Sequence, residues 1–127
     1  MLRREYGPGV PVLEVADDES WLAAFGVLPQ SDRATGDDFV RELKIPVGDA
    51  EEVQITWDVT DGSVRVRHHR SAVVVCDLFR ELATRLTVMS HGPAKEVVVE
   101  YGVAGVAGRS RIQIAPSVLI VDAVLRA

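Results

Sequence analysis

The sequence predicts a single α+β domain in which two short N-terminal helices pack on an antiparallel sheet of about five strands. Three observations favour this fold class. The length of 127 residues fits one domain over residues 1–127. Residues 17–43 contain two capped helix signals, and most of the following sequence alternates apolar and polar residues with a period of two. We expect the helices to cover one face of the sheet.

The chain is expected to begin with a strand. Residues 10–15 are rich in β-branched residues, and Pro11 restricts this strand to an edge or to a strand start. Residues 29–36 contain several turn-forming residues and predict a loop.

Two helix signals flank that loop. Asp17 or Asp18 can cap a helix over residues 19–25, and the next glycine ends it. Residues 37–43 predict a second helix because their acidic start suits the helix dipole and Pro46 follows.

A β-hairpin follows the helices. Residues 53–60 and 64–69 alternate apolar and polar side chains, so each predicts a strand with one buried face. Between them, Asp61 and Gly62 are typical of a two-residue type I′ turn.

The middle of the chain is less well determined. Residues 72–76 form a continuous apolar run, which is typical of a central strand covered on both faces or of the entry to a buried helix. Residues 77–90 fit a helix capped by Asp77 and also fit a hairpin that turns near residues 81–83. The pattern leaves both alternatives open.

Two strands are expected near the C-terminus, at residues 95–101 and 110–115. The glycine-rich segment 102–108 lacks the spacing of a dinucleotide-binding loop and precedes a strand instead of a helix, so we interpret it as a hairpin loop. Residues 118–125 predict a last strand or a short helix.

Charge is divided unevenly along this acidic protein, whose net charge is −5. Residues 1–63 contain 14 acidic and 5 basic side chains, a net charge of −9, whereas residues 64–127 contain 5 acidic and 9 basic ones, a net charge of +4. The negative total disfavours nucleic acid as a partner. Either the two halves pack as mutually attractive surfaces, or one of them forms a charged docking face.

The best candidate for a docking face is a set of arginines that alternate with apolar residues on two strands. Such a patch can bind carboxylates or an acidic protein surface. Each pair is separated by two positions and therefore projects from one face of its strand. The expected partner-binding residues are Arg65, Arg67, Arg109 and Arg111.

Neither a metal site nor a cofactor is expected. His68 and His69 are adjacent on a strand and so point to opposite faces, and Cys76, the single cysteine, lies in an apolar run. No catalytic motif is present, so a non-enzymatic role is favoured while the question of activity stays open.

These observations give two functional hypotheses. The first is a small protein-binding module, such as an inhibitor, an immunity-type protein or an accessory factor, that acts through the charged sheet face on an unidentified protein partner. The alternative is a small-molecule binding protein or small enzyme with an apolar pocket between the helices and the sheet. The residues expected to line that pocket are Trp21, Phe25, Trp57, Phe79 and, at its base, His68.

The location and assembly of the protein follow from its apolar segments. No segment is long and apolar enough for a membrane span or a secretion signal, so we expect a cytoplasmic protein that does not bind membranes. A homodimer joined through a sheet edge or through the apolar residues 118–125 is a further expectation.

Overall fold

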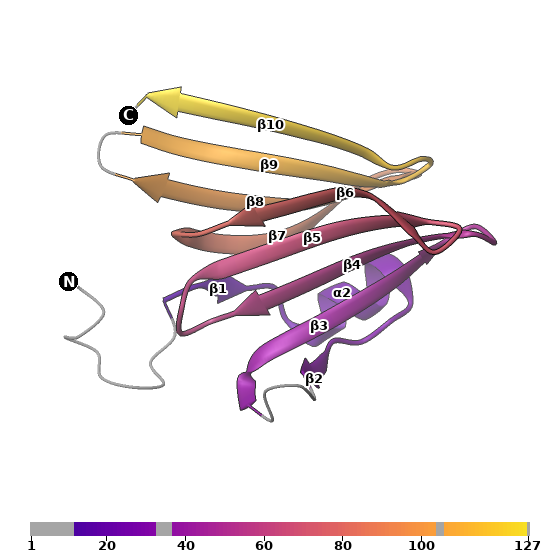
Figure 1. Cartoon of the computed structure of the whole chain (residues 1–127), viewed down its shortest axis with the longest axis horizontal. Coiled ribbons are helices and arrows are strands. Elements are labelled where there is room, and N and C mark those ends of the chain that lie inside the picture. Colours follow the sequence, from indigo (N-terminus) through magenta and orange to yellow (C-terminus); the bar gives the residue numbers. More distant parts are fainter. Residues whose placement is uncertain (1–11, 33–36, 104–105, 127) are drawn as a thin grey trace.

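The computed structural model describes residues 12–32, 37–103 and 106–126, which form a β-sandwich of two five-stranded sheets and one short helix (Figure 1). Sheet I has the strand order β2-β3-β4-β5-β6, and sheet II has the order β1-β7-β8-β9-β10. The elements are β1 (Glu14–Val15), α2 (Asp18–Phe25), β2 (Gln30–Asp32), β3 (Asp37–Val47), β4 (Glu51–Asp58), β5 (Ser63–Arg70), β6 (Val73–Arg80), β7 (Ala83–His91), β8 (Ala94–Val103), β9 (Val106–Ala115) and β10 (Leu119–Arg126).

The expected α+β fold class is wrong in two respects. The described residues form two sheets instead of one, and they contain only the first of the two expected helices. A period of two identifies a strand and its faces, but it does not determine which other strand will pair with it. Twisted sheets that approach about ten strands tend to split into two packed layers.

Strand β3 replaces the expected second helix at residues 37–43. Leu43 and Ile45 of β3 are buried, and they alternate with residues on the outer face. Pro46 lies within the strand instead of ending a helix. The pairing of β2 with β3 ends at Glu42, so β3 has an open edge beyond this residue, and an open edge tolerates proline.

The hairpin expected at residues 53–69 is confirmed by the antiparallel strands β4 and β5. Its turn differs from the expected type I′ turn because Gly62 has a positive φ of 71° and Asp61 does not. The Asp58 carboxylate instead accepts hydrogen bonds from the backbone N–H groups of Thr60 and Asp61. An aspartate side chain thus stabilises a longer turn.

Strand β6 corrects the interpretation of residues 72–76. These residues do not lie in a central strand, because β6 is the last strand of sheet I. Val73, Val74 and Val75 are exposed by 61%, 49% and 48%. The apolar run therefore lies along an edge of the sandwich.

Residues 77–90 form neither a helix nor a hairpin. The chain turns at residues 81–82, as in the hairpin alternative, but β6 belongs to sheet I and β7 to sheet II. The backbone N–H of Ala83 donates to the carbonyl of Gly62, in the turn that joins β4 and β5 of sheet I, and the Leu82 carbonyl accepts from the N–H of Gly102 in sheet II. This crossover is therefore attached to both sheets.

Sheet II opens with the short strand β1, which pairs with β7 in parallel. The expected strand at residues 10–15 is shortened to Glu14–Val15, and residues 10 and 11 lie outside the described residues. The expected loop at 29–36 is wrong for residues 30–32, which form β2, and its residues 33–36 lie outside the described residues.

The C-terminal part of sheet II agrees with the expected strands at residues 95–101 and 110–115. They belong to β8 and β9, whose antiparallel pairing continues into the glycine-rich segment, where Gly102 lies opposite Ala107 and Val103 opposite Val106. The loop expected at residues 102–108 is therefore wrong for residues 102–103 and 106–108, which belong to the two strands. Residues 104–105 of that segment are outside the described part of the chain. Residues 119–125 lie in a strand, β10, and do not form the alternative helix expected over residues 118–125.

Helix α2 confirms the first helix signal. The Asp17 carboxylate accepts a hydrogen bond of 2.9 Å from the Ser20 N–H, and Gly26 ends the helix with a φ of 73°. Trp21 is fully buried, and its indole N–H donates to the Ala16 carbonyl. The described part of the chain contains no helix long and apolar enough to span a membrane.

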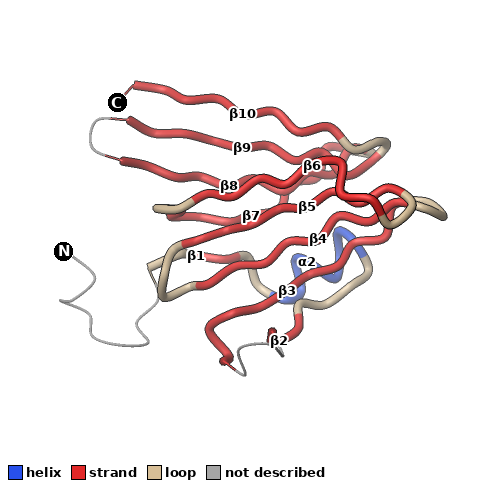
Figure 2. The backbone as a smooth tube through the Cα atoms, viewed as in Figure 1, coloured by secondary structure: helices blue, strands red, loops and turns tan. Residues whose placement is uncertain are grey.

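The two sheets face each other across one apolar core, to which β3, β4, β5, β7, β8 and β9 all contribute buried side chains. Figure 2 shows that the layers are offset. Helix α2 lies behind β3 and β4 on what we call the helix side of the sandwich. On the opposite side, β9 and β10 extend past β6, and we call this the open side.

Candidate functional site

Two of the expected partner-binding residues, Arg65 and Arg67, lie on the outer face of sheet I. They alternate along β5 with the buried Val64 and Val66 and therefore point away from the core. Arg65 forms a bidentate ion pair with Asp77 of β6, with distances of 2.8 and 2.9 Å. The Nε atom of Arg67 lies 3.5 Å from the same carboxylate. Two cations thus surround one anion, which leaves one positive charge in excess.

This cluster remains charged and accessible. The hydrogen bond from Arg65 holds the pKa of the Asp77 carboxyl below its ordinary value, and the same bond raises the pKa of Arg65. The three side chains are each 36% to 44% exposed. A partner can therefore reach the cluster without unfolding any strand.

An aromatic side chain lies beside the cluster. Phe79 is directly opposite Arg65 in the register of β5 and β6, and it is 49% exposed. A shallow hollow of about 370 Å³ runs over this part of sheet I, and Arg65, Arg67 and Phe79 contribute to its wall. We refer to Arg65, Arg67, Asp77 and Phe79 as the β5–β6 surface.

The structure does not bring the other two expected residues to this surface. Arg109 and Arg111 lie on the outer face of β9 in sheet II, on the far side of the core from β5. Arg111 forms a bidentate pair with Glu96, with both distances 3.0 Å, and this bond raises the pKa of Arg111. Glu96 is only 7% exposed, so Arg111 neutralises a carboxylate that would be costly to bury alone. Arg109 lies opposite Glu100.

Few of the described ion pairs join the acidic residues 1–63 to the basic residues 64–127. Glu51 lies 3.6 Å from Arg70, and Glu14 lies 3.9 Å from Arg85. The other arginines with described ion pairs contact acids of their own half, namely Asp18, Asp77, Glu96 and Asp122.

The structure brings together only some of the residues expected to line a pocket: Trp57 and Phe79 both line the hollow of about 370 Å³ over sheet I, and Trp21, Phe25 and His68 do not. Trp21 stacks on Trp57 with a centroid distance of 5.7 Å and on Phe25 at 6.3 Å. Trp21 and Trp57 are at most 2% exposed, so their rings fill the core on the helix side. Phe79 is on the outer face of sheet I, and His68 lies elsewhere on β5.

The histidine pair divides between the two faces of β5, as the sequence predicts. His68 is 6% exposed, and its Nε2–H donates to the Glu51 carboxylate at 2.6 Å. This bond holds the pKa of Glu51 below its ordinary value. Among the described residues, no group of three or more His, Cys, Asp or Glu side chains is arranged to hold a metal.

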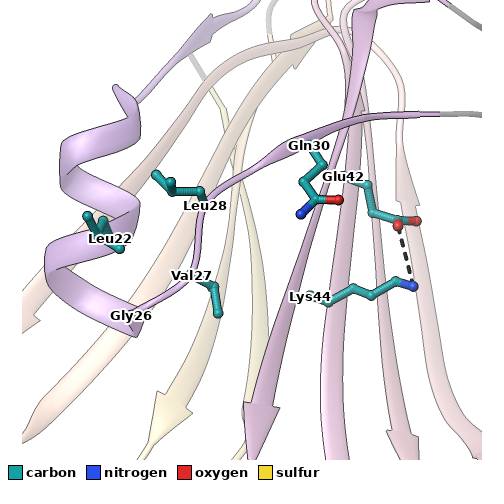
Figure 3. A pocket seen from close by; sticks show the side chains of 7 residues that line it. All are labelled: Leu22, Gly26, Val27, Leu28, Gln30, Glu42 and Lys44. Atoms are coloured by element: carbon teal, nitrogen blue, oxygen red, sulfur yellow. Dashed lines mark ion pairs between the residues drawn. The ribbon is translucent and has the colours of Figure 1, made fainter.

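A second hollow of about 320 Å³ lies beside α2, and Figure 3 shows its lining residues. Leu22 and Leu28 approach it from the helix and the following loop, while Glu42 and Lys44 of β3 approach it from the other side. The Lys44 ammonium is 3.7 Å from the Glu42 carboxylate. None of the five expected pocket residues lines this hollow.

A polar cluster on the open side is the main feature that sequence reasoning missed. Asp122 of β10 accepts hydrogen bonds from Arg80, Ser110 and Tyr101. Burial raises the pKa of Asp122, but the three donors outweigh it, so the net shift is downward. Arg80 also lies over the Tyr101 ring, 5.1 Å from its centroid. Because Arg80 is in sheet I and the other three are in sheet II, the cluster joins the sheets.

One glycine makes this cluster feasible. Gly108 of β9 lies directly opposite Tyr101, whose ring covers it. A Cβ atom at position 108 would be 2.2 Å from the Tyr101 ring. Gly108 was expected to lie in the hairpin loop, so the sequence did not predict that it would face Tyr101 across two paired strands.

Comparisons with known proteins give one structural match. No model of a known protein family matches the sequence, and no curated protein matches it either. The fold is similar to that of a chain in a solved structure described as a contact-dependent growth inhibition toxin–immunity protein complex from Klebsiella pneumoniae 342. The TM-score is 0.76, and the alignment covers 91% of this chain and 100% of that chain. At 10% sequence identity, the match establishes a shared fold.

Proposed function

We propose that this chain is an immunity-type protein that binds and neutralises a protein toxin in the cytoplasm, and that the toxin docks on the β5–β6 surface. The observation that carries the proposal is the position of the exposed Phe79 next to Arg65 in a shallow hollow. Aromatic residues and arginine are enriched among the residues that dominate binding energy at protein interfaces.

Two further features support a protein partner of this kind. The matching fold occurs in a complex of a toxin and its immunity protein. The exposed face combines an apolar anchor with the cluster of Arg65, Arg67 and Asp77, and the acidic Glu42 and Asp58 line the same hollow. Complementary charges of both signs favour the correct partner and speed its association.

We assign binding to Arg65 and Arg67 and not to Arg109 and Arg111. The second pair lies on the outer face of the other sheet, and Arg111 is committed to the buried Glu96. One docking face cannot include both pairs because the core lies between them.

A growth assay tests the proposal. The proteins encoded by the genes that flank this chain's gene are expressed one at a time in a bacterial host, and those that stop growth are expressed again together with this chain. We expect the chain to restore growth against one of them and to form a 1:1 complex with it, measured by calorimetry. If it neutralises and binds none of the growth-inhibiting proteins, the proposal is wrong.

Matched variants locate the interface. We expect Phe79→Asp to weaken toxin binding by at least about tenfold, because it removes the apolar anchor. Leu119→Asp is its control, since Leu119 is 54% exposed on a strand of the other sheet. Arg65→Glu and Arg109→Glu form a second matched pair. If each variant on sheet I loses no more toxin affinity than its control on sheet II, the interface is not on the β5–β6 surface.

A further inference from the structure

We propose that the free edge of β6 accepts an extended apolar segment of the toxin as an additional strand of sheet I, and that this segment carries a Lys or Arg that contacts Glu81. This inference rests on the proposed function and adds how the partner is held. Addition of a strand to an exposed sheet edge is a known mode of protein recognition, in which backbone hydrogen bonds supply much of the affinity.

The first support is the unprotected state of the edge. Strand β6 pairs with β5, and no other described strand pairs with it. Natural proteins usually protect such edges with charged residues such as lysine, with proline, with β-bulges or with a covering segment. Strand β6 contains neither lysine nor proline. Its register with β5 shifts at Val75, between Val74 and Cys76, and is regular from Cys76 to Arg80. These residues offer a regular backbone template, and the exposed Val73–Val75 run adjoins it.

The second support is a hollow at the end of this edge. It has a volume of about 500 Å³ and lies between the end of β6, the crossover and the open side of sheet II. Phe79 and Leu82 line it and are 49% and 55% exposed, and Tyr101 and Asp122 line it from sheet II. A strand added to β6 would extend sheet I toward the part of sheet II that projects past β6 (Figure 1).

The conformation of Leu82 is the third support. The backbone φ of Leu82 is 57°, in the left-handed region, which residues other than glycine and asparagine seldom adopt. The crossover holds this backbone through hydrogen bonds to both sheets, yet the leucine side chain remains more than half exposed. A strained residue that presents an apolar side chain to water is typical of a binding site.

Charge defines the chemistry of the occupant. Glu81 follows β6 directly, is exposed, and forms no ion pair with another described residue. Arg80 and Asp122 in the same hollow neutralise each other. The hollow therefore has one negative charge in excess, which suits a segment that is apolar along β6 and basic at Glu81.

A second copy of this chain fits the edge less well. Two β6 strands paired about a twofold axis at the middle of the strand would place Asp77 opposite Asp77 or opposite Val75. Like charges directly opposite each other destabilise a strand pair, and an aspartate opposite valine loses hydration. A foreign apolar strand avoids both arrangements.

Hydrogen exchange and a matched pair of variants test the inference with the toxin that the growth assay identifies. Val75→Lys adds a charge to the edge of β6, and Val121→Lys adds one to the edge of β10, where the valine is also 48% exposed. We expect Val75→Lys to weaken binding by about tenfold or more and Val121→Lys by less than about twofold. Within residues 76–80, the backbone amides that point to the free edge should become protected in the complex, whereas those that already bond β5 should change little. Thermal unfolding of each variant confirms that it is folded.

The outcomes separate the two proposals. If the toxin binds and is neutralised while the amides of β6 stay unprotected and Val75→Lys binds normally, strand addition is wrong and the proposed function stands. If Val121→Lys is the damaging variant, the partner uses the edge of β10 and the inference is overturned. Light scattering that shows a dimer of the chain alone, dissociated by Val75→Lys, would assign the edge to a second copy. If no toxin is neutralised, both proposals fail.

Glu81→Lys tests the charge part of the inference. This variant should weaken binding at low salt and lose much of its effect at high salt, because screening reduces interactions between exposed charges. Glu100→Lys, on sheet II, is its control. Equal binding by the two variants at low salt would show that no basic residue contacts Glu81.

Discussion

The helix side and the open side of the sandwich are covered by different kinds of side chain. On both sides one sheet extends past the other, so part of its inner face is not covered by the opposite sheet (Figure 2). On the helix side, α2 covers β3 and β4 with Trp21 stacked on Trp57, and both rings are buried. On the open side, Asp122 and its three hydrogen-bond donors join the sheets, and the carboxylate remains 35% exposed. The apolar cover closes one side, and the polar one leaves the other accessible.

This difference agrees with the proposed docking site, which includes the outer face of β5 and β6 and the edge of β6 at the open side. An apolar stack that excludes water contributes most to folding stability, whereas a partly hydrated polar cluster contributes less. The open side also contains the unpaired edge of β6 and the exposed Phe79 and Leu82. We therefore expect substitutions on the helix side to affect stability more than those on the open side.

Removal of Trp21 should have the largest effect. Trp21→Ala deletes a fully buried ring that stacks on Trp57 and Phe25, and we expect a loss of about 3–5 kcal/mol in the free energy of unfolding. Urea denaturation measures this loss. Leu22→Ala is the control, because the neighbouring Leu22 is 48% exposed and should change the stability by less than about 0.5 kcal/mol. Similar losses for both would contradict the apolar closure of the helix side.

Gly108→Ala should have the next largest effect, on the open side. The new Cβ would lie 2.2 Å from the Tyr101 ring, so the ring must move and lose its contacts with Asp122 and Arg80. We expect a loss of about 1–3 kcal/mol. In a Tyr101→Ala background the same substitution should cost much less, and a double-mutant cycle measures this coupling. Additive effects would show that the ring does not depend on Gly108.

Asp122→Asn should destabilise the protein by about 1 kcal/mol at pH 7, because it weakens the hydrogen bonds from three donors at a partly exposed site. The pKa of Asp122 is lower in the folded protein than in the unfolded chain. Its contribution to stability is thus fully present above the unfolded pKa of about 4 and disappears as the pH falls through the folded pKa. Thermal unfolding of both proteins at pH 7 and at about pH 3 tests this pH dependence. A difference in stability that persists unchanged in acid would contradict it.

The smallest effect is expected for Arg41→Met on the helix side. Arg41 forms an ion pair of 3.0 Å with Asp18 of α2 and also donates to the Pro29 carbonyl, but both side chains are partly exposed. We expect a loss below about 1 kcal/mol that decreases at high salt. Urea denaturation at two salt concentrations measures it. A loss as large as that of Trp21→Ala would show that ion pairing, and not apolar stacking, fixes the helix.

The sequence was sufficient where short-range patterns decide the structure. The capping aspartate and Gly26 defined α2, and alternation of apolar and polar residues defined the hairpin of β4 and β5 and the strand at residues 110–115 in β9. The sequence pattern did not predict β3. Arg41 lies on the same face as Leu43 and Ile45, so a charged residue interrupts the apolar face by which a strand is recognised. That arginine is satisfied by Asp18, 23 positions earlier in the chain, and no local pattern shows this contact.

The candidate site was predictable only in part. The alternation along β5 correctly directed Arg65 and Arg67 to the outer face, and the same rule applied to Arg109 and Arg111. It could not assign the two pairs to different sheets. The exposure of β6 was also unpredictable, because a run of three valines is typical of a buried strand and only its place at the end of sheet I exposes it.

The sequence by itself therefore determined the local elements of this protein: a capped helix, most of the strands and the direction of side chains on them. Capping, turn residues and periodicity act over a few residues and can be found in the chain itself. Only the tertiary structure decided that the strands form two offset sheets, that Tyr101 covers Gly108 beside Asp122, and that β6 is an open edge. Strand pairing and layer packing join residues far apart in the sequence, and their energies depend on the whole fold.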